Sequence, residues 1–258
     1  MVQAKNKIIQ NKKFKGSYWH CVFEASLIAK SAKPGQFLNI KLSDGLRPFL
    51  RRPFSIHDIS GNKLEILYEV LGEGTKILSG KKKGECLDII GPLGNGFDYR
   101  KTRKHCKQVA LLVAGGIGVA PLLYLAKKIK VTDLIVLIGA QTKSQVLCEK
   151  EFKDLGCDVR IATDDGSVGF GGRVTELLKS LLPKISNSSA VIYACGPKPM
   201  LKALADISSK SNIPAQLSME EHMSCGIGAC LGCVVKTKKG LERVCKEGPV
   251  FDAGHLIW

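Results

Sequence analysis

The sequence lacks an apolar segment close to its first residues, where MVQAKNKIIQ already carries two lysines. We therefore expect no secretory signal and a reducing, cytoplasmic location. It also lacks an uninterrupted membrane-spanning run. Residues 109–126 carry no charge, but three glycines and Pro121 interrupt them. This pattern predicts a buried strand, a glycine turn and a helix, and no membrane span.

Acidic residues are scarce, with 23 Asp and Glu against 39 Lys and Arg, so the net charge is +16. The excess is concentrated in residues 1–107, which hold 21 of the basic and 9 of the acidic residues. A basic half is one signature of nucleic-acid binding. The lysines are dispersed, however, and no nucleic-acid motif accompanies them. We expect no nucleic-acid partner, and a solvated basic surface that favours anionic cofactors.

Cysteine, by contrast, is abundant, and four of the ten cysteines lie together near the C-terminus. Cys225, Cys230 and Cys233 have the spacing C-x4-C-x2-C, and Cys245 follows after eleven further residues. This is the spacing of a plant-type [2Fe–2S] site, in which two irons need four thiolates. Glycines within the segment let the backbone approach such a cluster closely. The sequence therefore predicts these four cysteines as metal ligands.

Clustered cysteines also occur in structural zinc sites and in disulfides. A structural zinc site usually has two CxxC pairs, and this segment has only one. A disulfide pair is disfavoured in a reducing compartment. A zinc-stabilised interaction module stays open as an alternative, and colour distinguishes the two because zinc is spectrally silent. The remaining cysteines are scattered, and most are expected to be buried thiols.

Residues 1–107 contain short runs of β-branched and aromatic residues separated by turn signals. The runs cover residues 19–27, 36–42, 54–59, 64–71 and 86–90. Short strands at such spacing are typical of an antiparallel barrel.

The barrel region contains two segments that resemble the flavin site of the ferredoxin-reductase superfamily. Arg52, Pro53, Phe54 and Ser55 match its R-x-[YF]-[ST] motif. An arginine can bind phosphate through its planar fork, the aromatic ring can offer a flat face, and the hydroxyl can bond a flavin nitrogen. An arginine–proline turn at a strand start explains the same residues without a flavin. The second segment comprises Glu69, Val70, Leu71, Gly74 and Thr75, where a helix N-terminus suits a pyrophosphate and a plain cap by Thr75 is the simpler alternative.

Residues 108–219 alternate between strand and helix patterns. Strands are expected at 108–114, 134–139, 158–163, 190–195 and 215–219, and helices at 119–130, 146–155, 173–182 and 199–209. Such alternation predicts a parallel sheet covered by helices on both faces. Ligands of these sheets bind at the carboxyl ends of the strands.

Two glycine motifs follow strands of this expected sheet. Gly115, Gly116, Gly118 and Pro121 follow the first strand, and Cys195, Gly196 and Pro197 follow the fourth. They resemble the G-G-x-G-x-[AT]-P and C-G-P motifs of the same superfamily, in which the cysteine lies beside the nicotinamide ring. This implies a site for NAD(H), with Cys195 next to the reacting ring. Asp164 ends the third strand; its carboxylate could bind a ribose hydroxyl and repel a 2′-phosphate, which favours NADH over NADPH, although an Asp-Gly turn explains it equally.

The order of these parts implies an FAD-binding barrel over 1–100, an NAD-binding α/β domain over 101–219 and a [2Fe–2S] module over 220–258. Nearly the whole chain is similar to the electron-transfer subunits of dihydroorotate dehydrogenase B, most clearly in Met223–Cys233 and in the segment that follows Cys245.

That resemblance implies a partner subunit that oxidises dihydroorotate on FMN during pyrimidine (UMP) biosynthesis, and a heterotetramer of two plus two subunits. Electrons would pass from the partner through the cluster and FAD to NAD+, since a flavin exchanges both hydride and single electrons. An NAD(P)H–ferredoxin or sulfide-linked reductase subunit would share this layout and remains an alternative.

Overall fold

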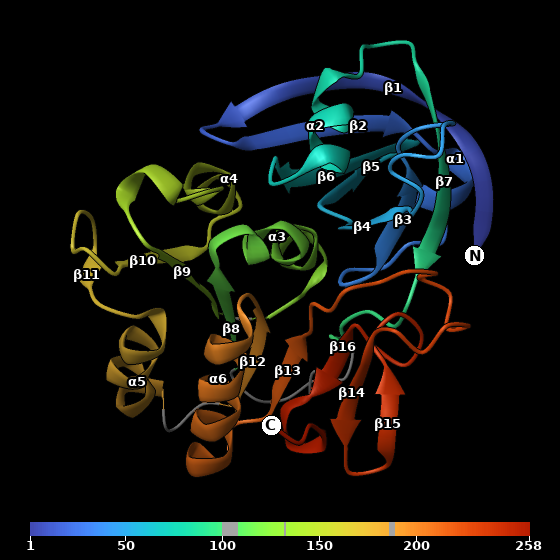
Figure 1. Ribbon diagram of the computed structural model, residues 1–258. Coiled ribbons are helices and arrows are strands. Elements are labelled where there is room, and N and C mark those ends of the chain that lie inside the picture. Colours follow the sequence, from blue (N-terminus) through green and yellow to red (C-terminus); the bar gives the residue numbers. More distant parts are fainter. Residues whose placement is uncertain (100–107, 132, 186–188) are drawn as a thin grey trace.

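The computed structural model describes residues 1–99, 108–131, 133–185 and 189–258. Figure 1 shows an antiparallel sheet at the N-terminal end of the chain, an α/β part beside it and a small module made by the C-terminal residues. Within these ranges no helix is both long and apolar enough to cross a membrane. The expected boundary between residues 100 and 101 and one of the scattered cysteines, Cys106, lie outside the described residues.

The first part is a seven-stranded antiparallel sheet in the order β4-β3-β7-β1-β2-β6-β5. Its strands are β1 (Val2–Lys15), β2 (Tyr18–Glu24), β3 (Phe37–Lys41), β4 (Arg52–Ser55), β5 (Asp58–Ser60), β6 (Lys63–Glu69) and β7 (Cys86–Leu93), and its helices are α1 (Ser26–Ala29) and α2 (Glu73–Gly80). β4 and β5 are the two ends of this order but follow one another in the sequence. The sheet therefore curls around a core that includes Phe23, Leu38 and Ile66, and the expected antiparallel barrel is confirmed.

Three details of the barrel differ from the sequence prediction. β1 was not expected, because only Asn6 and Ile8 of its fourteen residues are buried and the strand shows little hydrophobic pattern. Its pairing with β2 and β7 decides its conformation. The strand expected over 54–59 is two strands, β4 and β5, and the one expected over 19–27 ends at Glu24, where α1 soon begins.

The α/β part is a sheet in the order β11-β10-β9-β8-β12-β13-β16, parallel except for β16. Its strands are β8 (Gln108–Gly115), β9 (Asp133–Ala140), β10 (Asp158–Thr163), β11 (Phe170–Gly171), β12 (Ser189–Cys195), β13 (Ala215–Ser218) and β16 (Val250–Asp252). Its helices are α3 (Val119–Lys128), α4 (Glu149–Asp154), α5 (Val174–Ile185) and α6 (Lys198–Ser211), with 3-10 turns η1 (Gly116–Gly118) and η2 (Lys143–Gln145). The expected parallel sheet is confirmed.

Helices cover both faces of this sheet, as Figure 1 shows. Consecutive residues of β8 point to opposite faces of the sheet and enter different cores. Leu111 packs with α5 and α6, whereas Leu112 packs with α3 and α4. Burial on both faces explains why the strand reads as a continuous apolar run. The helix expected over 146–155 is shorter, since Cys148 has a left-handed backbone and α4 begins only at Glu149.

The C-terminal module is built on a hairpin of β14 (Val234–Thr237) and β15 (Gly240–Arg243). After the hairpin, β16 pairs with β13 and extends the parallel sheet by one antiparallel strand, and the 3-10 turn η3 (Ala253–His255) follows it. Val235, Val244 and Phe251 share a core with α6 and the sheet. The module is thus continuous with the α/β part.

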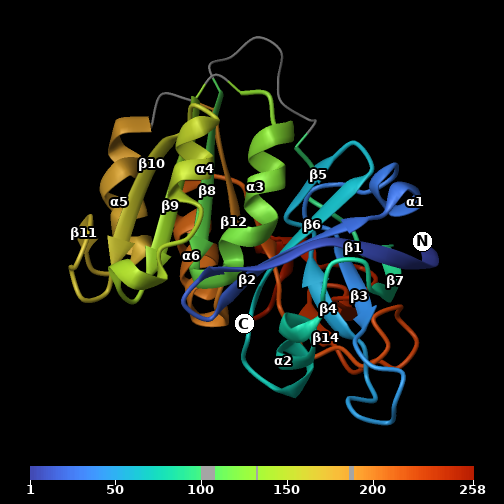
Figure 2. The same ribbon diagram turned by 90° about the horizontal axis from the view of Figure 1, so that it is seen from above.

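The barrel contacts the α/β part along α3 and at the tip of the β1–β2 hairpin, whose approach to the α/β part Figures 1 and 2 both show. At the tip, Lys15 Nζ donates hydrogen bonds to Lys143 O (3.1 Å) and Val146 O (2.9 Å). Tyr18 and Leu67 of the barrel enter the same core as α3. The two parts therefore pack through shared apolar residues as well as polar contacts.

A buried histidine lies in this interface. His57 is 4% exposed, and its Nδ1 donates a hydrogen bond to Ala120 O at 2.9 Å. Burial is the main cause that lowers the pKa of His57 to about 4; the nearby His20 lowers it further, whereas Glu65 and Asp58 act in the opposite direction. The ring is therefore neutral at physiological pH.

The lowered pKa of His57 leads us to expect that the protein loses stability in acid. In the unfolded chain His57 takes up a proton near its ordinary pKa of 6.5, whereas in the folded chain it does so only near pH 4. The folded state thus loses stability as the pH falls between these values, by about 2 kcal/mol between pH 7 and pH 5. Urea unfolding of the wild type and of His57→Gln at both pH values tests this. Between pH 7 and pH 5, the free energy of unfolding should fall by about 2 kcal/mol less in the variant than in the wild type. Equal decreases in the two proteins would contradict the prediction.

Candidate functional site

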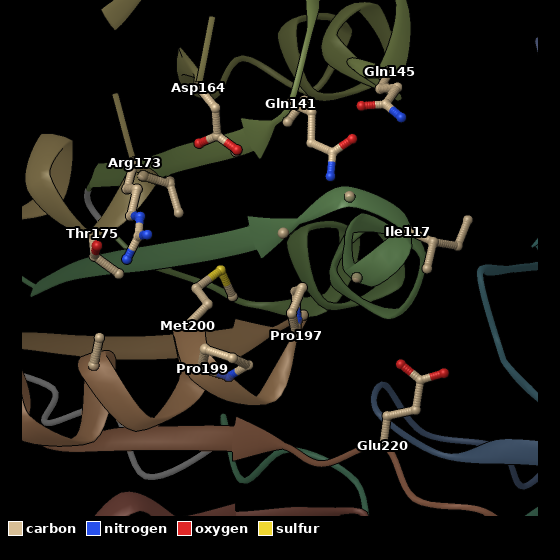
Figure 3. Close-up of a pocket in the computed structure, with 18 of the residues that line it drawn as sticks. Ile117, Gln141, Gln145, Asp164, Arg173, Thr175, Pro197, Pro199, Met200 and Glu220 are labelled. Atoms are coloured by element: carbon tan, nitrogen blue, oxygen red, sulfur yellow. The ribbon is translucent and has the colours of Figure 1, made fainter. Parts of the chain in front are cut away.

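A cavity of about 590 Å³ opens at the carboxyl ends of β8, β9 and β12 (Figure 3). Seven residues singled out in the sequence line it: Glu69, Gly115, Gly116, Gly118, Asp164, Gly196 and Pro197. The cavity lies where the strand order reverses, between β8 and β12, which is the position at which parallel sheets bind nucleotides.

The glycine turn is shaped by the close approach of two loops. A Cβ on Gly118 would lie 2.2 Å from Cys195 O, and Gly116 has a left-handed φ of +54°. Only glycine fits both requirements without displacement of the backbone. The turn passes through η1 directly into α3, so the start of this helix, where backbone N–H groups are free, lies at the wall of the cavity.

Two of the residues predicted for the nicotinamide site do not line the cavity. Pro121 is buried in the first turn of α3. Cys195 ends β12 beside the glycine turn, and burial, together with the negative charge of Glu220, raises the pKa of its thiol to about 12. The thiol is therefore neutral at physiological pH. It is suited to contact a ring and unsuited to act as a nucleophile.

Several lining residues were missed from the sequence: Tyr18, Gln141, Gln145, Arg173 and Glu220. Gln141 follows β9 directly, so the rule that ligands bind at strand ends would have found it. Tyr18 lies in the barrel and Glu220 follows the last parallel strand, and only the tertiary fold brings them to the cavity. Figure 3 shows Arg173 and Asp164 at the same end of the cavity.

Asp164 is expected to set the preference between the two nicotinamide cofactors. Asp164→Ala removes a carboxylate that would repel a 2′-phosphate and leaves Arg173, which pairs with no carboxylate among the described residues, to attract one. We expect kcat/KM with NADPH relative to NADH to rise roughly tenfold.

Asp165→Ala is the matched control. The Asp165 carboxyl accepts a hydrogen bond from Ser167 N at 3.0 Å within the same turn, and the residue does not line the cavity. Its cofactor preference should equal that of the wild type. An unchanged preference in Asp164→Ala would contradict the role in ribose binding.

The expected flavin strand is β4, and the arginine before it, Arg51, and its first residue, Arg52, have different partners. Arg51 Nη2 lies 2.8 Å from Asp88 Oδ2, which ties β4 to β7. Arg52 donates to Leu50 O at 2.7 Å but pairs with no carboxylate within the described part of the chain. Arg52 is therefore the arginine whose charge is available to a phosphate.

Arg52 packs against the start of α2. A Cβ on Gly74 would lie 3.2 Å from Arg52 Nε, a tight contact, so glycine at this position favours the approach. The first turn of a helix has free N–H groups and a partial positive charge. A guanidinium beside it is unfavourable unless an anion lies between them. The pair thus forms a site that suits a pyrophosphate.

Three other residues of the expected flavin site have different surroundings. Phe54 is 8% exposed and packs edge-to-face on Tyr68 at 5.8 Å, so it does not offer the open flat face expected from the sequence. Pro53 and Ser55 lie half-buried on the opposite face of β4, where a ligand can contact them.

In the second expected segment, some groups form hydrogen bonds within the protein, whereas others are exposed and can contact a ligand. The Thr75 hydroxyl accepts hydrogen bonds from Leu71 N (3.0 Å) and Gly72 N (3.2 Å), so it caps α2. Val70 N donates to Ser17 O. Leu71 is 81% exposed and is free to contact a bound group.

The four cysteines near the C-terminus meet as two pairs. The side chains of Cys225 and Cys230 contact one another, as do those of Cys233 and Cys245. Cys233 and Cys245 are buried, whereas Cys230 is exposed. Two irons with two thiolates each require this division into pairs.

The loop around Cys225 favours a thiolate. Burial alone would raise the pKa of Cys225, but the N–H groups of Ile227, Cys230 and Ala229 lower it to about 6. Ile227 N and Ala229 N lie 3.5 and 3.3 Å from the sulfur. Donors of this kind are typical of loops that hold iron–sulfur clusters.

The buried pair needs a cation. Burial and the adjacent Cys233 raise the pKa of Cys245 to about 12, so the Cys245 thiol becomes a thiolate only where a metal neutralises it. Among the described residues, no three His, Cys, Asp or Glu side chains converge as one metal ion would require. A binuclear cluster needs two thiolates on each iron, and the two pairs offer such a set.

The barrel holds this loop in place. Asn39 on β3 is fully buried, and its Nδ2 donates to Cys225 O at 2.9 Å. Gly226 has a φ of +69°, and a Cβ there would lie 2.4 Å from the same nitrogen. The sequence did not indicate Asn39, because its role depends on contact between segments far apart in the chain.

Of the other cysteines, Cys21, Cys148 and Cys157 are buried as expected, and Cys86 is exposed.

Together, the fold and the site define a ferredoxin-reductase-like oxidoreductase with an NAD-binding domain and an iron–sulfur module. A family model described as the oxidoreductase NAD-binding domain matches residues 112–206, and one described as the iron–sulfur cluster binding domain of dihydroorotate dehydrogenase B matches residues 220–257. The chain belongs to the family of dihydroorotate dehydrogenase B (NAD(+)) electron transfer subunits, as its curated relatives show.

Two such relatives come from Caldanaerobacter subterraneus subsp. tengcongensis and Bacillus pumilus. They are 42% and 43% identical to the chain, over 99% of its length and 99% and 98% of theirs. A solved NADH-dependent reduced ferredoxin-NADP oxidoreductase is similar over 99% of this chain and 90% of its own, with a TM-score of 0.87 and 28% identity. A ferredoxin NADP+ reductase from Neisseria gonorrhoeae, at 16% identity and a TM-score of 0.67 over 81% of this chain and 91% of its own, shares the fold.

Proposed function

We propose that the chain is the electron-transfer subunit of a dihydroorotate dehydrogenase and passes electrons from an FMN-containing, dihydroorotate-oxidising partner to NAD+. The observation that carries this is the combination, in one chain, of the nucleotide cavity, the Arg52 anion site and the paired cysteines. Full-length similarity to subunits of that name supports it. The proposal includes a heterotetramer of two subunits of each kind and a cytoplasmic location, where the four ligand thiols stay reduced.

Each part of the chain contributes a binding site to this function. The glycine turn, Gly196 and Pro197 are proposed to hold NAD(H) in the cavity, with Asp164 at the ribose. Arg52 and the start of α2 are proposed to bind the pyrophosphate of FAD, and Pro53, Ser55 and Leu71 to contact the rest of the cofactor. When bound, FAD exchanges hydride with nicotinamide and single electrons with a [2Fe–2S] cluster.

The remaining residues exclude unwanted chemistry. Cys195 keeps its proton at neutral pH, so beside a bound nicotinamide it would act as a neutral contact and not as a nucleophile. Cys233 and Cys245 are buried and would shield one side of a bound cluster from solvent, whereas Cys230 lies at the surface. We propose that this exposed side, flanked by the exposed Ile227 and Leu231, faces the partner subunit.

A second candidate is an NAD(P)H-linked ferredoxin reductase subunit. It is favoured by the similarity over nearly the full chain to the NADH-dependent reduced ferredoxin-NADP oxidoreductase. Both candidates use the same three sites and differ only in the partner that exchanges electrons with the cluster.

Two measurements test the proposal. The first is the visible spectrum of anaerobically purified protein before and after NADH is added. Flavin and cluster absorbance that both bleach support the electron-transfer function, and a colourless protein that cannot be reconstituted contradicts it. The second is dihydroorotate-dependent reduction of NAD+ after co-expression with a dihydroorotate-oxidising subunit. Activity only with reduced ferredoxin would identify the second candidate.

A further inference from the structure

One face of α3 is attached to the barrel by a row of polar contacts. The contacting residues follow one another at helical spacing, so they lie on the same side of the helix. The three contacts are His57 Nδ1 to Ala120 O (2.9 Å), Tyr124 OH to Ala32 O (3.3 Å) and the ion pair of Lys127 with Asp58. They hold the helix from its first turn to its last.

Of the three contacts, the ion pair is the one whose loss should destabilise the interface most. The side chain of Asp58 is only 7% exposed, and its Oδ1 has no hydrogen-bond partner within the described residues. Lys127 is the cation that compensates this carboxylate. A buried charge without a partner is strongly unfavourable, so the pair allows only arrangements of the two parts that keep Lys127 beside Asp58.

This contact joins the two segments that carry the proposed cofactor sites. α3 begins directly after the glycine turn Gly116–Gly118, which lines the nucleotide cavity. Asp58 begins β5, and only two residues separate β5 from β4, the strand of the proposed flavin site. A helix and a short strand transmit a displacement with little bending. The orientation of the glycine turn relative to β4 is thus fixed at the α3–β5 contact.

We propose that Asp58 and Lys127, supported by His57, are positioning residues for hydride transfer: they set where the nicotinamide ring lies relative to the flavin. This rests on the proposed function, since it requires FAD on the barrel and NAD(H) in the cavity. Neither residue lines the cavity, so they act through the two segments that they join. Misplacement of reacting groups by about 1 Å slows reactions by roughly a hundredfold.

The test separates positioning from simple stabilisation with two variants of the full, cofactor-loaded chain. Lys127→Met leaves Asp58 buried and unpaired, so it should lower both the melting temperature and the rate constant of flavin reduction by NADH. Lys127→Met/Asp58→Asn removes both charges and should recover most of the melting temperature, because a neutral pair avoids the unpaired charge. If the pair positions the domains, the rate stays roughly tenfold or more below the wild type.

Two readouts that do not depend on activity accompany the rates. ADP-ribose lacks the nicotinamide ring, and its Kd should stay within about twofold of the wild type in the double variant. Hydrogen exchange should become faster at the amides of α3 and β5. Lys153→Met is the matched control, since it breaks an exposed Lys–Glu pair on α4 in the same domain (Lys153 57% exposed) and should change none of these quantities.

The outcomes are distinct. A double variant that regains both melting temperature and rate overturns the positioning role and leaves a stabilising ion pair. A rate that falls together with ADP-ribose affinity also overturns it, because the nucleotide site itself would then be damaged. Failure of the proposed function would be visible earlier, as wild-type protein whose flavin NADH does not reduce.

Discussion

Replacement of Cys233 by serine is expected to remove the cluster. The Cys233 side chain is 3% exposed and packs on Cys245, so a hydroxyl there can neither supply a thiolate nor be replaced by a ligand from solvent. We expect iron and sulfide content to fall from about two per chain to near zero. Electron transfer to or from the partner should be lost, whereas flavin reduction by NADH should remain, because the nucleotide cavity is lined by other residues.

Cys86→Ser is the matched control for this variant. Cys86 is an exposed cysteine at the start of β7, outside the paired cysteines, and its replacement should leave the iron content unchanged.

The melting temperature of Cys233→Ser should also fall, since Cys233 and Cys245 belong to the core shared by the module and the sheet. Full iron content in Cys233→Ser would contradict the assignment of the ligands.

Replacement of Arg52 by glutamine is expected to release FAD. The substitution removes the charge that packs beside the start of α2 and leaves only the helix N-terminus to bind a pyrophosphate. Hydrogen bonds to charged groups contribute about 1.5–3 kcal/mol, which corresponds to a Kd for FAD that is roughly tenfold to a hundredfold higher. Equilibrium titration of the flavin-depleted chain with FAD measures this directly.

The neighbouring arginine provides the control. Arg51→Gln breaks the pair with Asp88 and should lower the melting temperature, while the Kd for FAD changes by less than about threefold. If Arg51→Gln weakens FAD binding more than Arg52→Gln does, the assignment of the two arginines is reversed.

The features that could be predicted from sequence are those set by local pattern. The apolar run of β8 with its glycine turn, and the spacing of the four cysteines, each depend on residues close in sequence. β1 could not be predicted in this way, because its lysine-rich residues become a strand only through pairing with β2 and β7.

The site residues also divide into those that local sequence patterns indicate and those that depend on contacts between distant segments. Asn39 reaches the cysteine loop across 186 positions of sequence, and Tyr18 reaches the nucleotide cavity from the barrel. Phe54 has the residue type of a flavin platform, but the alternation of β4 turns its ring into the core. Sequence patterns indicate which groups are present; the direction of each side chain depends on the packing of distant segments.

The pairing of β16 with β13 has a consequence for the synthesis of the chain. Until β16 has been synthesised, β13 is the edge of a parallel sheet, and its hydrogen-bonding groups are unpaired on one side. Exposed edges of this kind recruit strands from other chains. The cysteine loop and β16 both follow β13 in the sequence, so both are synthesised after the rest of the sheet. A chain that stops before these segments would lose its electron carrier and become prone to aggregation at the same time.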